Sequence, residues 1–163
     1  MSKSESRKAV ALAVSAAQEK KAENIAILEL DKSSSGFTDY FVICTGSNPR
    51  QLQAISDEVD QKLSSIGQEP RHVEGYNQAE WVLMDYVDFV VHIFSENARK
   101  FYDLERLWKS AKHLSPEDLS KPSERTPAKS RPAAKKTAVR KSAPAVKKPR
   151  KTAAKKATKR TRG

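Results

Sequence analysis

The sequence predicts an α/β fold, with a single mixed β-sheet of about five strands and flanking helices. Three observations support this prediction. Up to about residue 110, segments with the period of a strand alternate with segments with the period of a helix. Residues 37–45 are largely apolar on both faces, which is typical of a strand in the centre of a covered sheet. Residues 49–66 carry an apolar stripe at helical spacing, and such a stripe packs against a sheet.

The first elements are expected to be a helix over residues 4–20 and a strand over residues 23–31. Small apolar residues recur along one side of the helix, and Ser2 or Ser4 is a suitable N-cap. In the strand, alternate side chains face opposite ways, and one of the two faces is consistently apolar. A Ser- and Gly-rich loop is expected at residues 32–36, before the central strand.

The helix over residues 49–66 has the clearest local signals in the chain. Asn48 is a favourable N-cap and Pro49 suits the first helical position. Gln51 lies three residues after the cap, as in a capping box. Gly67 is expected to end the helix in the left-handed conformation. The apolar stripe consists of Leu52, Ile55, Val59, Leu63 and Ile66.

Three short strands and a helical segment complete the predicted body. Residues 69–73 are expected to form an edge strand, because Pro70 lacks an amide proton for pairing. Residues 81–85 and 89–94 are expected to form a hairpin with a tight turn. Ser95 then caps a helical segment. Its apolar residues at helical spacing are Phe101, Leu104, Leu107 and Trp108.

Charge is distributed very unevenly along the chain. From Lys121 to the C-terminus there are 17 Lys and Arg residues and one Glu, so this part has a net charge of +16. Residues 1–120 hold the other 14 basic residues and 19 acidic ones, which gives a net charge of −5. The basic character of the whole chain, +11, is therefore a property of its C-terminal part.

The composition also changes near residue 115. From there Pro, Ala, Lys, Ser and Thr dominate, and the only large aliphatic residues after Leu119 are Val139 and Val146. Such a segment cannot bury enough apolar surface to offset the entropy lost on ordering. We therefore expect a folded domain at residues 1–114 and a disordered basic tail at residues 115–163.

The sequence offers little support for an enzyme. Gly46 and Ser47 follow a predicted strand and precede a helix, which is how a nucleotidyltransferase holds a nucleotide phosphate. That chemistry also needs an Asp-x-Asp pair on the next strand to bind Mg²⁺, and residues 69–73 contain no such pair. The three histidines do not have a metal-ligand spacing, and one cysteine cannot form a zinc site. We expect no catalytic, cofactor-binding or metal-binding residues, with a nucleotidyltransferase-like enzyme as an alternative.

Other classes of protein are also disfavoured. Cys44, the single cysteine, lies in the apolar central strand, where burial is expected rather than nucleophilic reactivity. The chain contains no run of 18 or more apolar residues and no apolar segment of a signal peptide near its start. We therefore expect a cytoplasmic protein without membrane contact.

Residues 5–110 contain several separate motifs. They are Thr38-Asp39-Tyr40-Phe41-Val42-Ile43, Glu74-Gly75, Trp81 to Asp85, Val91-His92-Ile93-Phe94, Arg99, Tyr102-Asp103-Leu104-Glu105 and Leu107-Trp108. Together these motifs resemble the Iojap family, the ribosomal silencing factors. In the hairpin, Val87 stands where that family usually has Gly, and a backbone with positive φ there would suit Val badly.

The resemblance implies a binding protein whose fold is similar to a nucleotidyltransferase core. Ribosomal silencing factors bind the large ribosomal subunit through its protein uL14, on the face that meets the small subunit. The implied mechanism is steric, because the bound factor occupies space that the small subunit needs. Subunits then cannot join, and translation is repressed.

Large aromatic side chains near acidic residues in the last third of the body have the composition of a protein interface. The acidic body favours a basic partner such as a ribosomal protein. The alternative is that Trp81 and Trp108 cap the core and that His92 is a satisfied buried residue. The expected partner-binding residues are Glu74, Trp81, Asp85, His92, Tyr102, Leu104 and Trp108.

The basic tail is expected to bind polyphosphate by counterion release, and our hypothesis is that it contacts ribosomal RNA near the docking site. The tail has no aromatic residues to stack on bases, so sequence-specific recognition is not expected. Alternatives are a solubilising extension, or an architectural nucleic-acid-binding protein, which the acidic body argues against. An exposed hairpin edge and an aromatic surface would also support a homodimer.

Overall fold

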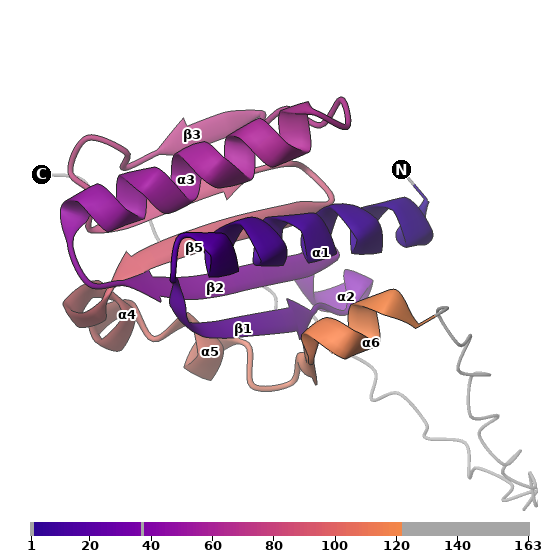
Figure 1. Ribbon diagram of the computed structural model, residues 1–163. Coiled ribbons are helices and arrows are strands. Elements are labelled where there is room, and N and C mark those ends of the chain that lie inside the picture. Colours follow the sequence, from indigo (N-terminus) through magenta and orange to yellow (C-terminus); the bar gives the residue numbers. More distant parts are fainter. Residues whose placement is uncertain (1, 37, 122–163) are drawn as a thin grey trace, which may run out of the picture. The chain divides into compact units, whose positions relative to one another are not determined.

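Six strands form one open sheet in the order β3-β4-β5-β2-β1-β6 (Figure 1). The computed structural model describes residues 2–36 and 38–121. Strands β2 and β5 pair in parallel, and the other neighbouring strands pair antiparallel. The predicted mixed sheet is thus confirmed, with one strand more than expected. The strands are β1 (Glu23–Glu29), β2 (Tyr40–Gly46), β3 (His72–Glu74), β4 (Trp81–Asp85), β5 (Phe89–Ser95) and β6 (Lys112–Leu114).

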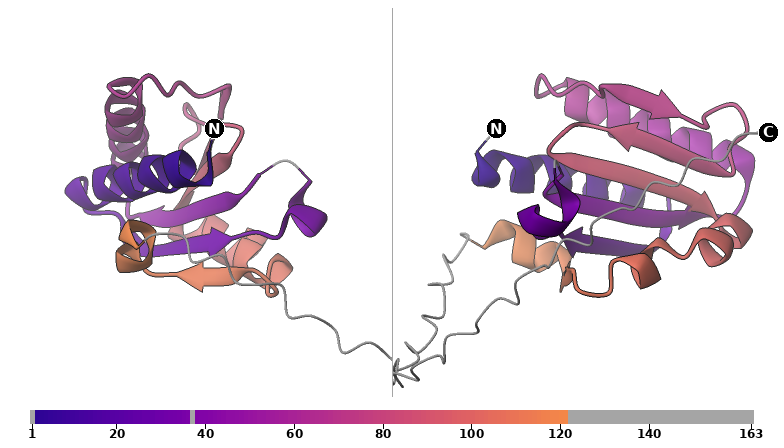
Figure 2. Two further views of the ribbon diagram at one scale, coloured as in Figure 1. Left: turned by 90° about the vertical axis from the view of Figure 1, so that its right-hand side faces the viewer. Right: turned by 180° about the vertical axis from the view of Figure 1, so that it is seen from behind.

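Two long helices, α1 (Lys3–Glu19) and α3 (Pro49–Ser64), cover one face of the sheet (Figures 1 and 2). The main core lies between these helices and the strand residues that face them, including Ile27, Val42 and Val91. A second, smaller core lies on the opposite face. The remaining helices are α2 (Lys32–Ser35), α4 (Glu96–Tyr102), α5 (Leu104–Leu107) and α6 (Pro116–Ser120).

Both long helices begin at side-chain caps. Ser2, not Ser4, caps α1, and Glu5 bonds back to the Ser2 amide to complete a capping box. Asn48 caps α3 by accepting a hydrogen bond of 2.9 Å from the amide of Gln51. The Gln51 side chain does not bond back to Asn48 as the capping box predicted. Its oxygen accepts from the Ser47 amide at 2.7 Å, and its nitrogen donates to the backbone carbonyls after α1.

Two local predictions need correction. Residues 32–35 form the short helix α2 rather than a loop. Helix α3 ends at Ser64, and Ile66, expected to be the last residue of its apolar stripe, is 51% exposed. Gly67 adopts the predicted left-handed conformation, with φ of +75°. The chain therefore turns before the stripe could bury its last residue.

The turn between β4 and β5 adopts the conformation that was expected to suit its sequence badly. Val87 has φ of +74°, in the left-handed region that favours glycine. Its amide donates to the carboxylate of Asp85 at 2.8 Å. A β-branched residue is thus held in a strained conformation at the tip of the hairpin.

The folded part extends beyond the predicted boundary. We predicted disorder from residue 115, but α6 lies at Pro116–Ser120 and packs on α1. Ser115 and Asp118 form a capping box, and Leu119 is buried in the main core. The Arg7 side chain donates a hydrogen bond to the Asp118 carbonyl. The rest of the predicted tail, from residue 122, lies outside the described residues.

No helix in residues 2–36 and 38–121 is both long enough and apolar enough to cross a membrane.

Candidate protein-interaction surface

The face of the sheet opposite α1 and α3 carries a cluster of aromatic rings. The right-hand view of Figure 2 shows this face, with α4 and α5 near β1. The ring centroids of Trp81 and Tyr102 are 4.6 Å apart, and those of Phe41 and His92 are 4.9 Å apart. The aromatic cluster consists of Phe41, Trp81, His92, Phe94, Tyr102 and Trp108.

Strand register brings four of these rings together. Trp81 begins β4 and lies opposite Phe94 of β5, and their rings stack at 5.0 Å. His92 lies two residues before Phe94, so both side chains project from the same face of the sheet. Because β2 runs parallel to β5, Phe41 lies beside Val90 and reaches the same face. The cluster is therefore assembled from strands that are distant in the sequence.

His92 is held in one tautomer by Trp81. The indole Nε1–H of Trp81 donates to Nδ1 of His92 over 3.1 Å. The side chain is buried, and this burial lowers the pKa of His92 to about 4. The imidazole is thus neutral at neutral pH, with its proton on Nε2. Nε2 is buried and has no hydrogen-bond partner within the described part of the chain.

A branched set of hydrogen bonds from Arg99 holds α4 and α5 against the sheet. Its guanidinium makes two bonds to the Glu105 carboxylate, at 2.8 and 3.3 Å, which tie α4 to α5. The same group donates to Thr45 Oγ1 at 2.8 Å and to the Asn24 carbonyl, which ties α4 to β1 and β2. Asp103, with φ of +45°, ends α4 and lets α5 begin at the next residue. Arg99 thereby fixes the positions of the rings on these helices.

Most of the predicted partner-binding residues lie in or beside the aromatic cluster. Tyr102 is 46% exposed next to Trp81, so the cluster has an accessible edge. Leu104 and Trp108 are partly buried and pack against the second core, so they also serve the fold. Trp81 is likewise part of that core.

The two acidic residues of the predicted set lie outside the rings. Glu74 is exposed on β3, opposite Leu83 of the neighbouring strand. Asp85 ends β4, where its carboxylate accepts the bond from Val87 described above. Asp85 therefore has a structural role in the hairpin, and Glu74 is the freer of the two to contact a partner.

Sequence reasoning missed two aromatic residues. Phe41 joins His92 to Trp108, with ring centroids at 4.9 and 5.5 Å. Phe101 is 81% exposed and contacts the edge of the Tyr102 ring. Phe101 was expected on the apolar stripe of the last helix, but α4 ends at Tyr102 and Phe101 faces solvent.

Gly75 allows the chain to pass close to the start of β4. Its φ is +75°, and a Cβ atom at this position would lie 2.0 Å from the carbonyl oxygen of Trp81. Only glycine avoids both the conformational strain and the collision. The Glu74-Gly75 motif thus fits the backbone that presents Trp81.

The residues considered for catalysis are engaged in the fold. The amide and hydroxyl of Ser47 both donate to the Gln51 side chain, at 2.7 and 2.8 Å. Cys44 is buried in β2, and burial raises the pKa of its thiol to about 12. Within the described ranges, no group of three His, Cys, Asp or Glu side chains is placed to hold a metal ion.

The chain is similar to known proteins over most of its length. The model of the family described as "Ribosomal silencing factor during starvation" matches residues 3–158. The chain is 42% identical over 108 residues to the ribosomal silencing factor RsfS of Halalkalibacterium halodurans, covering 66% of this chain and 92% of the relative.

One solved structure and one more distant relative extend this comparison. A crystal structure from Bacillus halodurans aligns with a TM-score of 0.59 and 40% identity, over 66% of this chain and 97% of that one. The mouse protein "Mitochondrial assembly of ribosomal large subunit protein 1" is 28% identical over 98 residues, covering 58% of this chain and 42% of the relative.

Proposed function

The chain belongs to the ribosomal silencing factor family, and we propose that it binds the large ribosomal subunit through uL14 and sterically blocks joining of the small subunit. Family membership assigns the protein to translation regulation. The observation that carries the proposal is an aromatic cluster with an accessible edge, on the face of the sheet that α1 and α3 leave uncovered.

The names of related proteins support the large ribosomal subunit as the partner. One relative is named for assembly of the mitochondrial large ribosomal subunit. Residues 1–120 carry a net charge of −5, which complements a basic ribosomal protein and would speed association with it. Ribosome binding also implies action in the cytoplasm.

The aromatic cluster has the properties of a binding hot spot. Trp and Tyr are enriched at such positions because they bury a large area and lose little side-chain entropy. Trp81 is already fixed by His92 and Tyr102, so little ordering would be needed when a partner binds. We propose that Trp81, Tyr102, Leu104 and Trp108 form the centre of the contact, with the buried His92 beneath them holding Trp81. Glu74 and Asp85 would lie at the rim.

Blocking of subunit joining requires a bound body and no chemistry. The folded part needs only to dock with enough affinity to outlast encounters between the subunits. Complementarity of shape and charge supplies that affinity. A regulator of this kind would act stoichiometrically, one protein to each large subunit.

Cosedimentation with purified ribosomal subunits tests this proposal. We expect the full chain to travel with the large subunit and to reduce the peak of joined ribosomes. Tyr102→Ala should weaken binding by roughly thirtyfold, as expected for a hot-spot residue that contributes about 2 kcal/mol. Ile66→Ala is a matched control, because Ile66 is similarly exposed but lies beyond the end of α3.

Two results would contradict the proposal. Binding of the full chain to the small subunit alone would exclude the steric mechanism. Equal losses for Tyr102→Ala and Ile66→Ala would exclude the aromatic cluster as the docking site. The same exposed face would also support a homodimer, and sedimentation velocity of the purified protein at several concentrations would detect one.

We also propose that the basic residues from 121 onward contact ribosomal RNA next to the docking site. Their net charge of +16 supports binding to phosphate groups without sequence preference. Tethering to the docked body would raise the effective concentration of this segment near the RNA.

A further inference from the structure

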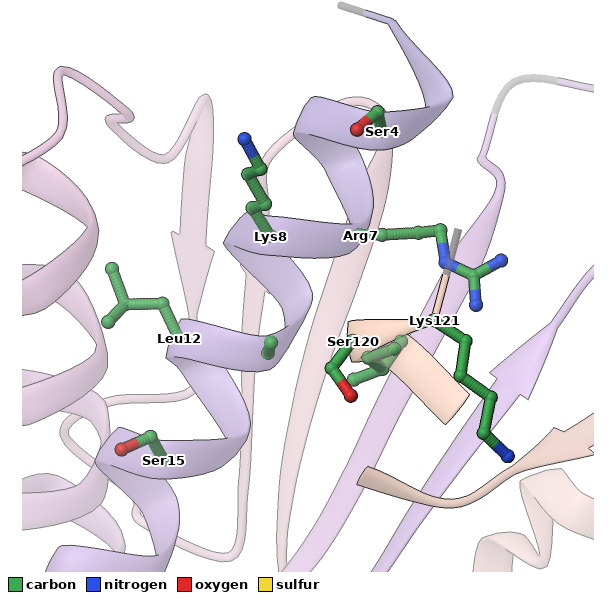
Figure 3. Close-up of a pocket in the computed structure, with 9 residues that line it drawn as sticks. Ser4, Arg7, Lys8, Leu12, Ser15, Ser120 and Lys121 are labelled. Atoms are coloured by element: carbon green, nitrogen blue, oxygen red, sulfur yellow. The ribbon is translucent and has the colours of Figure 1, made fainter. Parts of the chain in front are cut away.

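A groove runs between α1 and α6, on the opposite layer of the molecule from the aromatic cluster. Its volume is about 660 Å³. Figure 3 shows that its side chains come from both sides of α1 and from the end of α6. The lining residues are Ser4, Arg7, Lys8, Ala11, Leu12, Ser15, Leu119, Ser120 and Lys121.

The lining is basic although the body is acidic. Lys8 and Lys121 supply two exposed positive charges, and three serines supply hydroxyl groups. Arg7 adds a third charge, which is largely buried and bonded to the Asp118 carbonyl. None of the lining residues is acidic. Lys121 pairs with Asp118 at 3.1 Å, but its side chain is 70% exposed, and such a surface pair gives way readily to a stronger anion. The groove therefore suits a ligand that carries negative charge and accepts hydrogen bonds.

Helix α6 is held in place next to α1. Arg7 donates to the Asp118 carbonyl, and Leu119 is buried against the main core. Lys121 is consequently held at the rim of the groove. The 42 residues that follow it carry 16 Lys and Arg residues and one Glu.

The positive charge of the groove indicates which kind of ligand it would bind. The segment after Lys121 has the same sign of charge as the groove, so the two repel and this segment is not the occupant. A strand of RNA bound by that segment would arrive at the groove with regularly spaced phosphates. Lys and Arg neutralise phosphates, and Ser hydroxyls donate to their oxygens.

We propose that the α1/α6 groove binds the phosphodiester backbone of RNA and continues the RNA contact of residues 121–163 onto the folded body. This inference rests on the RNA binding proposed above for those residues. It adds a fixed site, so that part of the RNA contact has a defined place on the body. Protein and RNA would then be bound on opposite faces of the sheet at the same time.

The salt dependence of RNA binding tests the proposal. The full chain is titrated against a labelled single-stranded oligouridylate at several KCl concentrations, with fluorescence anisotropy as the readout. In Lys8→Gln/Lys121→Gln, two phosphate contacts are lost, so the slope of log K against log [salt] should fall by about 1.4. Affinity at 0.1 M salt should fall by about tenfold or more.

A matched double variant controls for charge alone. Lys100→Gln/Lys109→Gln makes the same change in net charge at exposed lysines of α4 and of the segment after α5. We expect its slope and affinity to equal those of the unmodified chain. Glutamine keeps most of the lysine side chain, and equal thermal midpoints would show that all variants are folded.

The possible results separate the two proposals. If the unmodified chain does not bind the oligonucleotide, both the RNA binding of residues 121–163 and the groove proposal fail. If it binds and the two double variants behave alike, only the groove proposal fails. The same titration with labelled poly-glutamate gives a third result. If Lys8→Gln/Lys121→Gln loses affinity for poly-glutamate but not for RNA, the groove binds an acidic protein, and the proposal is overturned.

Discussion

Trp81 and His92 form a hydrogen bond of 3.1 Å across β4 and β5 in which the buried imidazole is the acceptor. Protonation of Nδ1 would abolish this bond and place a charge in the second core. Burial lowers the pKa of His92 from 6.5 to about 4. Between these values the unfolded chain binds more protons than the folded one, so the free energy of unfolding falls as the pH decreases.

The first prediction follows from this difference in pKa. The contribution of His92 should be complete above about pH 6.5 and should decrease by up to about 3 kcal/mol as the pH falls toward 4. Urea denaturation at pH 7, 6 and 5 measures the effect. His92→Gln removes the titrating group, so its stability should change much less over this range. His113→Gln, a change at an exposed histidine, should keep the full dependence.

The second prediction concerns the hairpin turn. Val87→Gly should raise the free energy of unfolding by about 0.5–1 kcal/mol, because relief of the left-handed strain exceeds the entropy that glycine adds to the unfolded chain. Val73 in β3 is a matched control, since it is 44% exposed, compared with 45% for Val87. Val73→Gly should be destabilising. Chemical denaturation compares the two, and a loss of stability in Val87→Gly would show that the turn is not strained.

The third prediction separates backbone strain from collision. Gly75 and Gly67 both have φ of +75°, but only at Gly75 would a Cβ atom meet another group, the Trp81 carbonyl. Gly67→Ala should cost about 1 kcal/mol from the conformation alone. Gly75→Ala should cost at least about 2 kcal/mol more, because the start of β4 must move. Equal thermal shifts in the two variants would mean that the backbone near Trp81 adapts freely.

The fourth prediction concerns the link between α4 and α5. The bidentate pair Arg99–Glu105 is partly buried, so a double-mutant cycle with Arg99→Met and Glu105→Gln should give a coupling energy of about 1–2 kcal/mol. The exposed pair Lys100–Glu96 lies on the same helix, and solvent screening should make its coupling energy much smaller. Similar coupling in both pairs would show that the Arg99 link does not fix α5.

Cap residues, proline and glycine in the sequence correctly predicted elements whose ends are fixed by residues close by in the chain. Asn48, Pro49 and Gly67 mark the ends of α3, and the structure places its cap and its left-handed end at these residues. Strand β6 has three residues, too few to show a strand period. Helix α6 depends on burial of Leu119 and on the bond from Arg7, which is 111 residues away from Asp118. Composition cannot reveal contacts of that kind.

The site was predicted by residue type rather than by position. Trp81, Tyr102 and Trp108 were chosen because large aromatic residues are common in interfaces, and they do lie in the aromatic cluster. Phe41 was missed because its place depends on the parallel pairing of β2 with β5. Glu105 binds Arg99 across the break that Asp103 introduces. A break between two helices removes the regular spacing from which such pairs are recognised.

Labelling of the Cys44 thiol can report local opening of the folded protein. The sequence has one cysteine, and it lies fully buried in β2, between β5 and β1 in the sheet. A thiol reagent can reach it only after the main core around this strand opens. The rate of labelling in native buffer therefore reports the population of molecules with an open core, without denaturant and without an introduced probe.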